Sequence, residues 1–303
     1  MIDAPVQLLP LLRERPWGRE DLAPYFESNG KRIGEVWFTC DENPTSLGMP
    51  LGDLIRRNPD VLGEACHASH PGICPLLVKF LFTTERLSVQ VHPDDEYAER
   101  HHHSLGKTEA WYVVDSREPG ELAVGFREML TRERLRESAL SGEIEQLLDW
   151  RKVKPGDVVF TPAGTVHAIG AGLTICEIQE NSDITYRLYD YGRPRELHLE
   201  HGVAVSHLGP HHHNVTPKPL ADWRDELVAS TYFRIERLRP KKAFRIRGGL
   251  PYYLLLICLR GQVWLIPAHA SEVAMDGLGA EWILTYTADR ALSAEMLEAA
   301  ERS

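Results

Sequence analysis

Two neighbouring polar side chains, Gln90 and His92, are spaced so that they can act on the same ligand. They lie in a short segment rich in branched apolar residues, which is typical of a β-strand. On a strand, residues i and i+2 point to the same face, so these two side chains share one face and Val89 and Val91 take the other. A strand that is polar on one face and apolar on the other lines a wet pocket.

Two further residues, Glu109 and His167, each open a predicted strand directly after a glycine-containing turn. Together with Gln90 and His92 they offer two imidazoles, a carboxylate and an amide carbonyl. Zinc accepts this mixture of nitrogen and oxygen ligands and can keep a position open for water or substrate. A lone histidine is more often an ordinary pocket side chain, so the metal site depends on all four residues together. We expect one Zn²⁺ per chain, with another divalent metal as the alternative.

The elements that must position these residues are short strands separated by glycine and proline turns. Branched and aromatic runs recur at regular spacing over residues 76–188, which is typical of a sandwich or jelly-roll barrel. Residues 127–150 interrupt the pattern with dense charges and helical spacing of leucines, and predict two short helices broken near Ser141 and Gly142. The sequence therefore predicts a mainly β fold with helical insertions.

The chain divides into two predicted domains. Residues 207–219 contain three prolines and three consecutive histidines, which is typical of a linker. We expect a catalytic domain over residues 1–215, with the helical insertion at about 127–150. Strand-like runs after the linker predict a smaller β-domain over residues 216–303.

Composition narrows the class of function. Lysine and arginine number 34 against 44 aspartates and glutamates, a net charge of −10, which argues against an extended nucleic-acid surface. A few cations in one cleft still suffice for a small anionic substrate. No apolar run is long enough to span a bilayer, and the N-terminal residues lack the order of a signal peptide. We expect a cytoplasmic protein with no nucleic-acid or membrane partner, and sequence gives no oligomeric state.

The cysteines and the histidine runs are given plainer interpretations. The five cysteines are scattered without metal-ligand or redox spacing, so we expect reduced thiols. Residues 101–103 and 211–213 are both triple histidines. Consecutive residues do not converge easily on one ion, so we expect solvated loops, with a weak adventitious metal site as the alternative.

The motifs resemble those of type I mannose-6-phosphate isomerases, in their short bacterial form within the cupin superfamily. The resemblance covers most of residues 10–200 and is most specific around His92. The segments that carry it are Arg15–Gly18, Leu87–Asp95, Gly106–Tyr112, Pro162–Gly170 and Ile184–Arg193. It implies a cupin jelly-roll barrel followed by a second, abbreviated cupin-like domain, because characteristic turns of that domain run together within residues 262–268.

The resemblance also implies roles for individual residues. It makes Gln90, His92, Glu109 and His167 the zinc ligands and Arg187 the catalytic arginine. Lys107 is a candidate for proton transfer, and Trp17, Ser88 and Glu177 are candidates for the substrate pocket, with Glu177 as a second candidate base. Without the resemblance, Lys107 is equally a plain substrate contact, and Arg187 an ion-pair partner of Asp183 or Asp190. Arg193 and Lys79 are weaker phosphate candidates.

The implied activity is interconversion of mannose 6-phosphate and fructose 6-phosphate through an enediol. An isomerase of another sugar or sugar phosphate, a non-catalytic sugar-binding cupin and a cupin dioxygenase are the alternatives. A small-molecule sugar phosphate is the expected partner.

Overall fold

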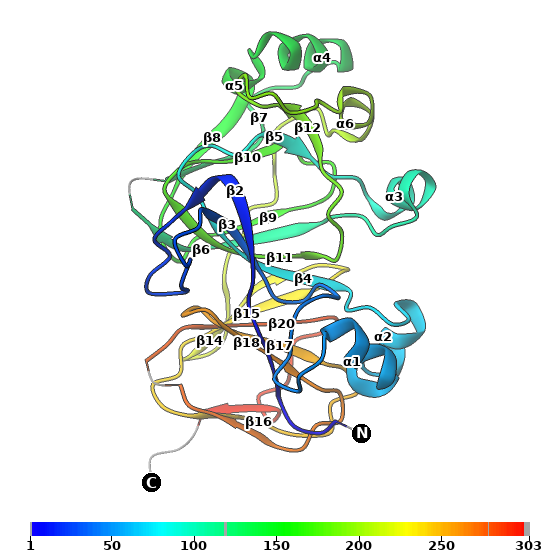
Figure 1. The fold of residues 1–303 in the computed structure, drawn as a ribbon, viewed down its shortest axis with the longest axis vertical. Helices are drawn as coiled ribbons and strands as arrows, with labels where there is room; N and C mark the ends of the chain where they lie inside the picture. Colours follow the sequence, from blue (N-terminus) through cyan, green and yellow to red (C-terminus); the bar gives the residue numbers. More distant parts are fainter. Residues whose placement is uncertain (1, 118–119, 278, 300–303) are drawn as a thin grey trace.

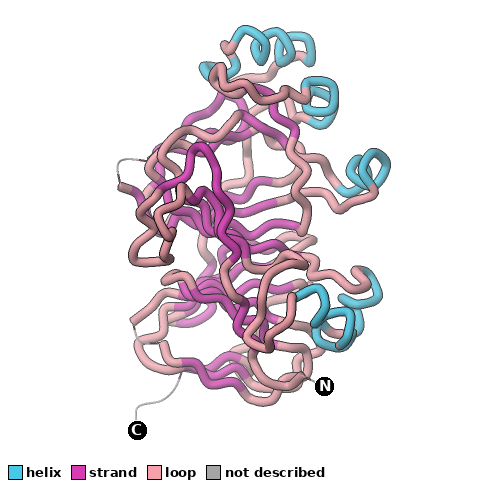
Figure 2. Tube along the Cα trace, viewed as in Figure 1, coloured by secondary structure: helices cyan, strands magenta, loops and turns pink. Residues whose placement is uncertain are grey.

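The computed structural model describes residues 2–117, 120–277 and 279–299, and arranges them as four stacked β-sheets (Figures 1 and 2). A five-stranded sheet faces a six-stranded sheet in the first half of the chain. A seven-stranded sheet and a three-stranded sheet follow in the second half. Separate buried apolar clusters fill the three gaps between successive sheets. The mainly β prediction is confirmed.

The first half supplies the two sheets that matter for chemistry. The order of the six-stranded sheet is β2 (Leu11–Arg19), β3 (Ile33–Trp37), β4 (Leu76–Phe82), β11 (Leu173–Glu180), β6 (Glu109–Ser116) and β9 (Val158–Thr161). The order of the five-stranded sheet is β12 (Tyr186–Tyr189), β5 (Val89–Val91), β10 (His167–Ile169), β7 (Gly120–Phe126) and β8 (Leu148–Val153). All pairings within both sheets are antiparallel.

The second half is shorter and its second sheet is small. The seven-stranded sheet contains β1 (Val6–Leu8), β18 (Gln262–Ile266), β17 (Leu254–Cys258), β20 (Trp282–Tyr286), β15 (Arg234–Leu238), β14 (Arg224–Ala229) and β13 (Lys218–Ala221). The three-stranded sheet contains β19 (Val273–Met275), β16 (Phe244–Ile246) and β21 (Leu297–Ala299). Strand β1 comes from the start of the chain but pairs with β18. The division into residues 1–215 and 216–303 stays a prediction.

Strand β4 shows why the inner sheets are buried on both faces. Its seven residues are all buried: Val78, Phe80 and Phe82 enter the core shared with the second half, whereas Lys79 and Leu81 face the five-stranded sheet. A strand covered on both faces is apolar almost throughout, so a charged residue within it marks a polar pocket.

The helices lie at the periphery of the stack (Figure 2). They are α1 (Leu51–Arg57), the 3-10 turn η1 (Pro59–Leu62), α2 (Glu64–Ser69), α3 (Asp95–His102), α4 (Arg132–Ser141), α5 (Ile144–Leu147) and α6 (Leu199–Val205). The predicted break is at Gly142, which ends α4 with φ +84°. The predicted insertion extends too far, because residues 148–150 begin strand β8, which pairs with β7. Residues of α4, α5 and α6 cover the outer face of the five-stranded sheet.

Five of the six residues in the histidine runs are exposed, as predicted, but two of these lie in a helix rather than a loop, and His211 is buried. His101 and His102 end helix α3, and their rings lie beside His201 of α6, with ring centroids 5.4 and 5.8 Å from it. His211 is buried, because it packs against Gly125 of strand β7. The five cysteines are buried and unpaired, as predicted. No helix among the described residues is long and apolar enough to cross a membrane.

Candidate functional site

The site lies between the five- and six-stranded sheets and takes residues from both. Strand register places His167 opposite Gln90 and Gln90 opposite Arg187, so three side chains from adjacent strands share the inner face. On the outer face Val89 and Val91 join the core under the helices. The alternation predicted for this strand is therefore present.

Three of the four predicted ligands converge. His92, Glu109 and His167 are almost fully buried, and one ligand atom from each lies within 4.8 Å of the others. Glu109 Oε2 is 3.5 Å from His92 Nε2, and Glu109 Oε1 is 3.2 Å from His167 Nε2. Among the described residues no other group of three or more histidine, cysteine or acidic side chains meets in this way.

The protein backbone orients both imidazoles. His92 Nδ1 lies 2.9 Å from the Ile184 carbonyl oxygen and His167 Nδ1 lies 2.9 Å from that of Thr165. Each Nδ1–H donates to its carbonyl, which leaves the Nε2 lone pair directed at Glu109. Burial is the main cause that lowers the pKa of both rings, that of His167 to about 4, so both are neutral near pH 7. Neutral, oriented imidazoles are the form that binds a metal.

The carboxylate of Glu109 supplies the strongest test of whether a cation fits. Neither oxygen accepts a hydrogen bond, although the side chain is only 1% exposed. Burial raises the pKa of this carboxyl, and the nearby Glu177 raises it further. A buried carboxylate without donors is costly, and a divalent cation between it and two imidazole nitrogens would remove that cost. The residues present therefore fit a metal.

Gln90, the fourth predicted ligand, lies beside the cluster. Its amide nitrogen is 3.2 Å from His167 Nε2, and its oxygen accepts a long hydrogen bond (3.4 Å) from Ser88. A half-turn of the amide would direct the oxygen to the cluster, as metal ligation requires. Its role as a ligand stays a prediction.

Backbone hydrogen bonds tie the ligand-bearing turns to one another. The carbonyl of His92 accepts from Gly164 N–H, and that of Pro93 accepts from Lys107 N–H. Gly164 has φ +83°, a conformation that favours glycine, and an added Cβ would lie 2.9 Å from Val205 O. These contacts fix the spacing between segments that are far apart in the sequence.

A cavity of about 440 Å³ opens beside the cluster, a size that suits a small ligand. All the residues predicted for the substrate and the reaction line it: Trp17, Ser88, Lys107, Glu177 and Arg187. Lys107 Nζ is 3.3 Å from His92 Nε2 and 3.7 Å from Glu109 Oε2. These residues share one cavity, and their individual roles stay predictions.

The polar wall of the cavity includes a buried ion pair. Lys79 Nζ lies 3.4 Å from Glu177 Oε2, and Trp111 Nε1–H donates to Glu177 Oε1 at 3.0 Å. Burial acts to lower the pKa of Lys79, but Glu177, Glu35 and other acids outweigh it and the pKa is raised. Lys79 was only a weak phosphate candidate in the sequence. Its position within the apolar run Leu76–Phe82 was the signal that it faces a pocket.

The two remaining basic candidates behave differently. Arg187 lines the cavity and donates through Nη1 to the carbonyl of Glu196, without an ion pair to Asp183 or Asp190. Arg193 is held outside the cavity lining by Asp190 and Glu85. Sequence reasoning did not place four other residues that line the cavity: Arg15, Glu35, Asp183 and Arg195. Arg195 lies in an irregular segment after strand β12.

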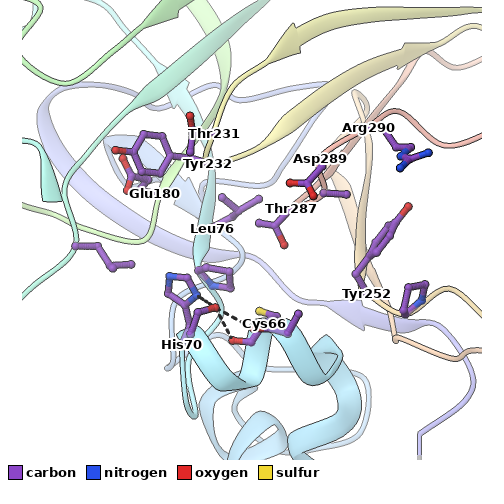
Figure 3. Close-up of a pocket in the computed structure, with 16 residues that line it drawn as sticks. Cys66, His70, Leu76, Glu180, Thr231, Tyr232, Tyr252, Thr287, Asp289 and Arg290 are labelled. Atoms are coloured by element: carbon purple, nitrogen blue, oxygen red, sulfur yellow. Dashed lines mark hydrogen bonds between the residues drawn. The ribbon is translucent and has the colours of Figure 1, made fainter.

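A larger cavity of about 530 Å³ lies elsewhere, between helix α2 and the seven-stranded sheet (Figure 3). Glu180 and Tyr232 lie on one side of it, and Tyr252, Asp289 and Arg290 lie on the other (Figure 3). Glu180 Oε2 accepts the Thr108 N–H at 2.7 Å, so this residue braces the turn before Glu109. The cavity lacks any converging set of metal ligands among the described residues.

The comparisons with known proteins agree on one family. Residues 13–136 match the catalytic domain of phosphomannose isomerase type I. Mannose-6-phosphate isomerase ManA of Bacillus subtilis is 35% identical over 276 residues, covering 85% of this chain and 86% of its own length. Mannose-6-phosphate isomerase of Streptococcus mutans is 35% identical over 277 residues, covering 85% of each.

Solved structures give the same answer at the level of the fold. The crystal structure of mannose 6-phosphate isomerase from Bacillus subtilis superposes with a TM-score of 0.82 at 26% identity, covering 93% of this chain and 99% of that one. A point mutant of phosphomannose isomerase from Salmonella typhimurium superposes with a TM-score of 0.77 at 17% identity, covering 94% and 99%. The resemblance identified in the sequence is thereby confirmed.

Glu109→Gln tests whether the cluster is built for a cation. We expect metal affinity to fall by more than the 10–100-fold typical of mutations outside the ligand shell. We also expect the metal-free variant to melt at a higher temperature than the metal-free parent, because a buried carboxyl group that accepts no hydrogen bond is replaced by a neutral amide. Metal content by elemental analysis and thermal melting measure the two effects. Glu99→Gln, on the exposed surface of α3, is the control. Unchanged metal content in Glu109→Gln would contradict the assignment.

Glu180→Gln tests the carboxyl behind the turn. Burial is the main cause that raises its pKa to about 8, from 4.5. A carboxyl with a raised folded-state pKa leaves stability intact below pH 4.5 and lowers it as pH rises from 4.5 to 8. Because glutamine does not titrate, the free energy of unfolding of Glu180→Gln should rise relative to that of the parent as the pH increases from 4.5 to about 8. Urea denaturation at several pH values measures it, with exposed Glu96→Gln as the control. Parallel pH profiles for parent and Glu180→Gln would refute the shift.

Proposed function

Because the chain belongs to the type I phosphomannose isomerases, we propose that the cavity beside His92, Glu109 and His167 is its active site. The protein is a metal-dependent aldose–ketose isomerase that interconverts mannose 6-phosphate and fructose 6-phosphate. The observation that carries the assignment of the site is the buried Glu109 carboxylate, which has no hydrogen-bond donor and lies between two oriented imidazoles.

The metal we propose is zinc, one per chain, held by His92, Glu109, His167 and Gln90. Two imidazoles, a carboxylate and an amide oxygen are a ligand set that zinc accepts, and manganese, cobalt and iron compete for such sites. When bound, the cation acts as a Lewis acid that stabilises negative charge on the sugar oxygens.

The reaction moves a proton between C2 and C1 of the open-chain sugar through an enediol, and negative charge develops on O1 and O2. Arg187 suits the stabilisation of that charge: it stays protonated, it lines the cavity and its buried Nε lacks a partner among the described residues. We propose that it donates to these oxygens.

Two side chains compete for the role of base. Lys107 lies next to the metal cluster, with Nζ 3.3 Å from His92 Nε2. Glu177 is a carboxylate whose orientation is fixed by Trp111 and Lys79. Both face the same cavity, and either can exchange a proton with a carbon held between them. Trp17 and Ser88 complete the wall against which the sugar lies.

We propose a cytoplasmic location, supported by five cysteines that form no disulfide.

Removal and return of metal tests the function. Purified protein is stripped with a chelator, reconstituted with zinc, manganese, cobalt or iron, and assayed for conversion of mannose 6-phosphate to fructose 6-phosphate. We expect turnover to disappear with the metal and to return with zinc. A protein that binds the sugar phosphate but turns it over with none of these metals is the non-catalytic sugar-binding cupin instead.

Arg187→Ala tests the role of the arginine. We expect kcat to fall about 100–1,000-fold, as when a fixed donor to a developing oxyanion is lost, with metal content unchanged. Arg187→Lys keeps the charge but loses the planar fork, so its kcat should lie between that of the parent and that of Arg187→Ala. Steady-state kinetics and elemental analysis are the measurements. Loss of metal or of folding in Arg187→Ala would show a structural role instead.

A further inference from the structure

A small cavity of about 230 Å³ lies behind the turn that carries His167, and four histidines line it: His207, His211, His212 and His213. Thr165 and Val166 of the turn line it as well. None of the described residues lines both this cavity and the one beside the metal cluster. The proposed isomerase reaction uses none of these four histidines, so their gathering calls for a separate account.

His211 has the orientation of a metal ligand. Its side chain is in a residue only 7% exposed, and its ring bonds to the backbone of His213. Its Nε2 is buried and has no hydrogen-bond partner among the described residues. One ring nitrogen bonded to backbone and the other left with a free lone pair is the arrangement of metal-binding histidines. Burial is the main cause that lowers the pKa of His211 to about 4, so the ring is neutral near pH 7.

A second imidazole lies at the distance that a shared ion requires. The ring centroids of His211 and His213 are 5.4 Å apart. Two imidazoles on one tetrahedral zinc have centroids about 5 Å apart, because each Zn–N bond is about 2 Å long. Among the described residues no three imidazole nitrogens here lie as close as the ligand atoms of the cluster. His207 and His213 are exposed, so their rings can turn toward Nε2 of His211.

The chain around the cavity is fixed by backbone contacts. The N–H of His207 donates to the carbonyl of Gly164 at 2.8 Å, and Pro210 forms a β-bridge with Gly125 of β7. The nearby cation is already paired: Arg151 donates to the carbonyl of His211 and forms an ion pair with Asp149 at 2.8 Å. The scaffold for the histidines is therefore in place, and no unpaired arginine opposes a second cation there.

We propose that His207, His211 and His213 bind a second divalent transition-metal ion, separate from the one at the cluster. Imidazole ligands suit zinc, copper and nickel, whereas magnesium and calcium prefer oxygen. The bound ion would fasten residues 207–213 to the turn at residues 164–167 that carries a ligand of the first site. Its effect would be on stability, because the four histidines lie outside the active-site cavity. The proposal does not depend on the isomerase activity.

Zinc titration of metal-free protein tests the second site, with elemental analysis as the second measure of stoichiometry. We expect two zinc ions per chain in the parent and one in Glu109→Gln, which disables the cluster. Glu109→Gln/His211→Gln should bind none. Glu109→Gln/His213→Ala should bind its ion at least 10-fold more weakly than Glu109→Gln, and it covers the case in which the buried substitution does not fold, because His213 is exposed.

His103→Ala is the matched control, since its side chain is 89% exposed and belongs to the other histidine run. It should keep both zinc ions. One zinc ion per chain in the parent would overturn the proposal. So would a second ion that survives in both His211→Gln and His213→Ala, or one that is lost in His103→Ala, which would place an adventitious ion on residues 101–103.

Thermal melting tests whether the second ion stabilises the fold. At free zinc about 100 times the dissociation constant, the melting temperature of Glu109→Gln should rise by about 4 °C. Glu109→Gln/His213→Ala at the same zinc concentration should not show this rise. An equal rise in both proteins would overturn the proposal. If the parent shows no isomerase turnover but the second ion still depends on His211 and His213, the proposed function fails and the second metal site stands.

Discussion

The burial of one carboxylate organises the active half of the molecule. Glu109 lies between the five- and six-stranded sheets, and neither of its oxygens accepts a hydrogen bond. Burial in this state lowers the stability of the fold unless a cation is bound. Contacts within the protein hold the other ligand side chains in position for that cation. Two backbone carbonyls hold the imidazoles of His92 and His167 with their Nε2 atoms toward Glu109, and the turns that carry the three residues are bonded to one another. Metal binding would remove the free-energy cost of the empty site, and this gain would add to the affinity for the metal.

The four-layer stack explains how such a site stays dry and rigid. Each inner strand of the six-stranded sheet presents one face to the cavity and the other to the core shared with the second half. On β4, Lys79 points into the cavity, whereas Phe80 packs among residues of the seven-stranded sheet such as Ile257. The shortened second half therefore has a mechanical role that does not need a complete second barrel: it covers the back of the sheet that carries Glu109, Glu177 and Lys79. Strand β1, drawn from the N-terminal end of the described chain, ties the two halves together.

Local patterns in the sequence predicted much of this structure. Strands β4, β18 and β20 are compact apolar runs between turn residues, the kind of local pattern from which strands can be predicted. The same-face pair Gln90 and His92 followed from strand geometry alone. The pairing of strands that are distant in the sequence could not be predicted from these local patterns. The register that sets His167 and Arg187 on either side of Gln90, the pairing of β1 with β18 and the strand at residues 148–150 depend on partners distant in the sequence. Arg195 was missed for the same reason, since only the folded chain places it beside the cavity.

Different charged groups line the two ends of the cavity. One end holds the carboxylate and imidazoles that demand a cation, and the other holds the guanidinium groups of Arg187 and Arg195. Between them, Lys79 and Glu177 form an ion pair, and Asp183 adds a further carboxylate to the wall. A chain with a net charge of −10 thus presents a local positive field only where its substrate needs it. A divalent cation at the cluster would carry more charge than the single carboxylate of Glu109, so an anionic group of the substrate would be attracted at either end of the cavity.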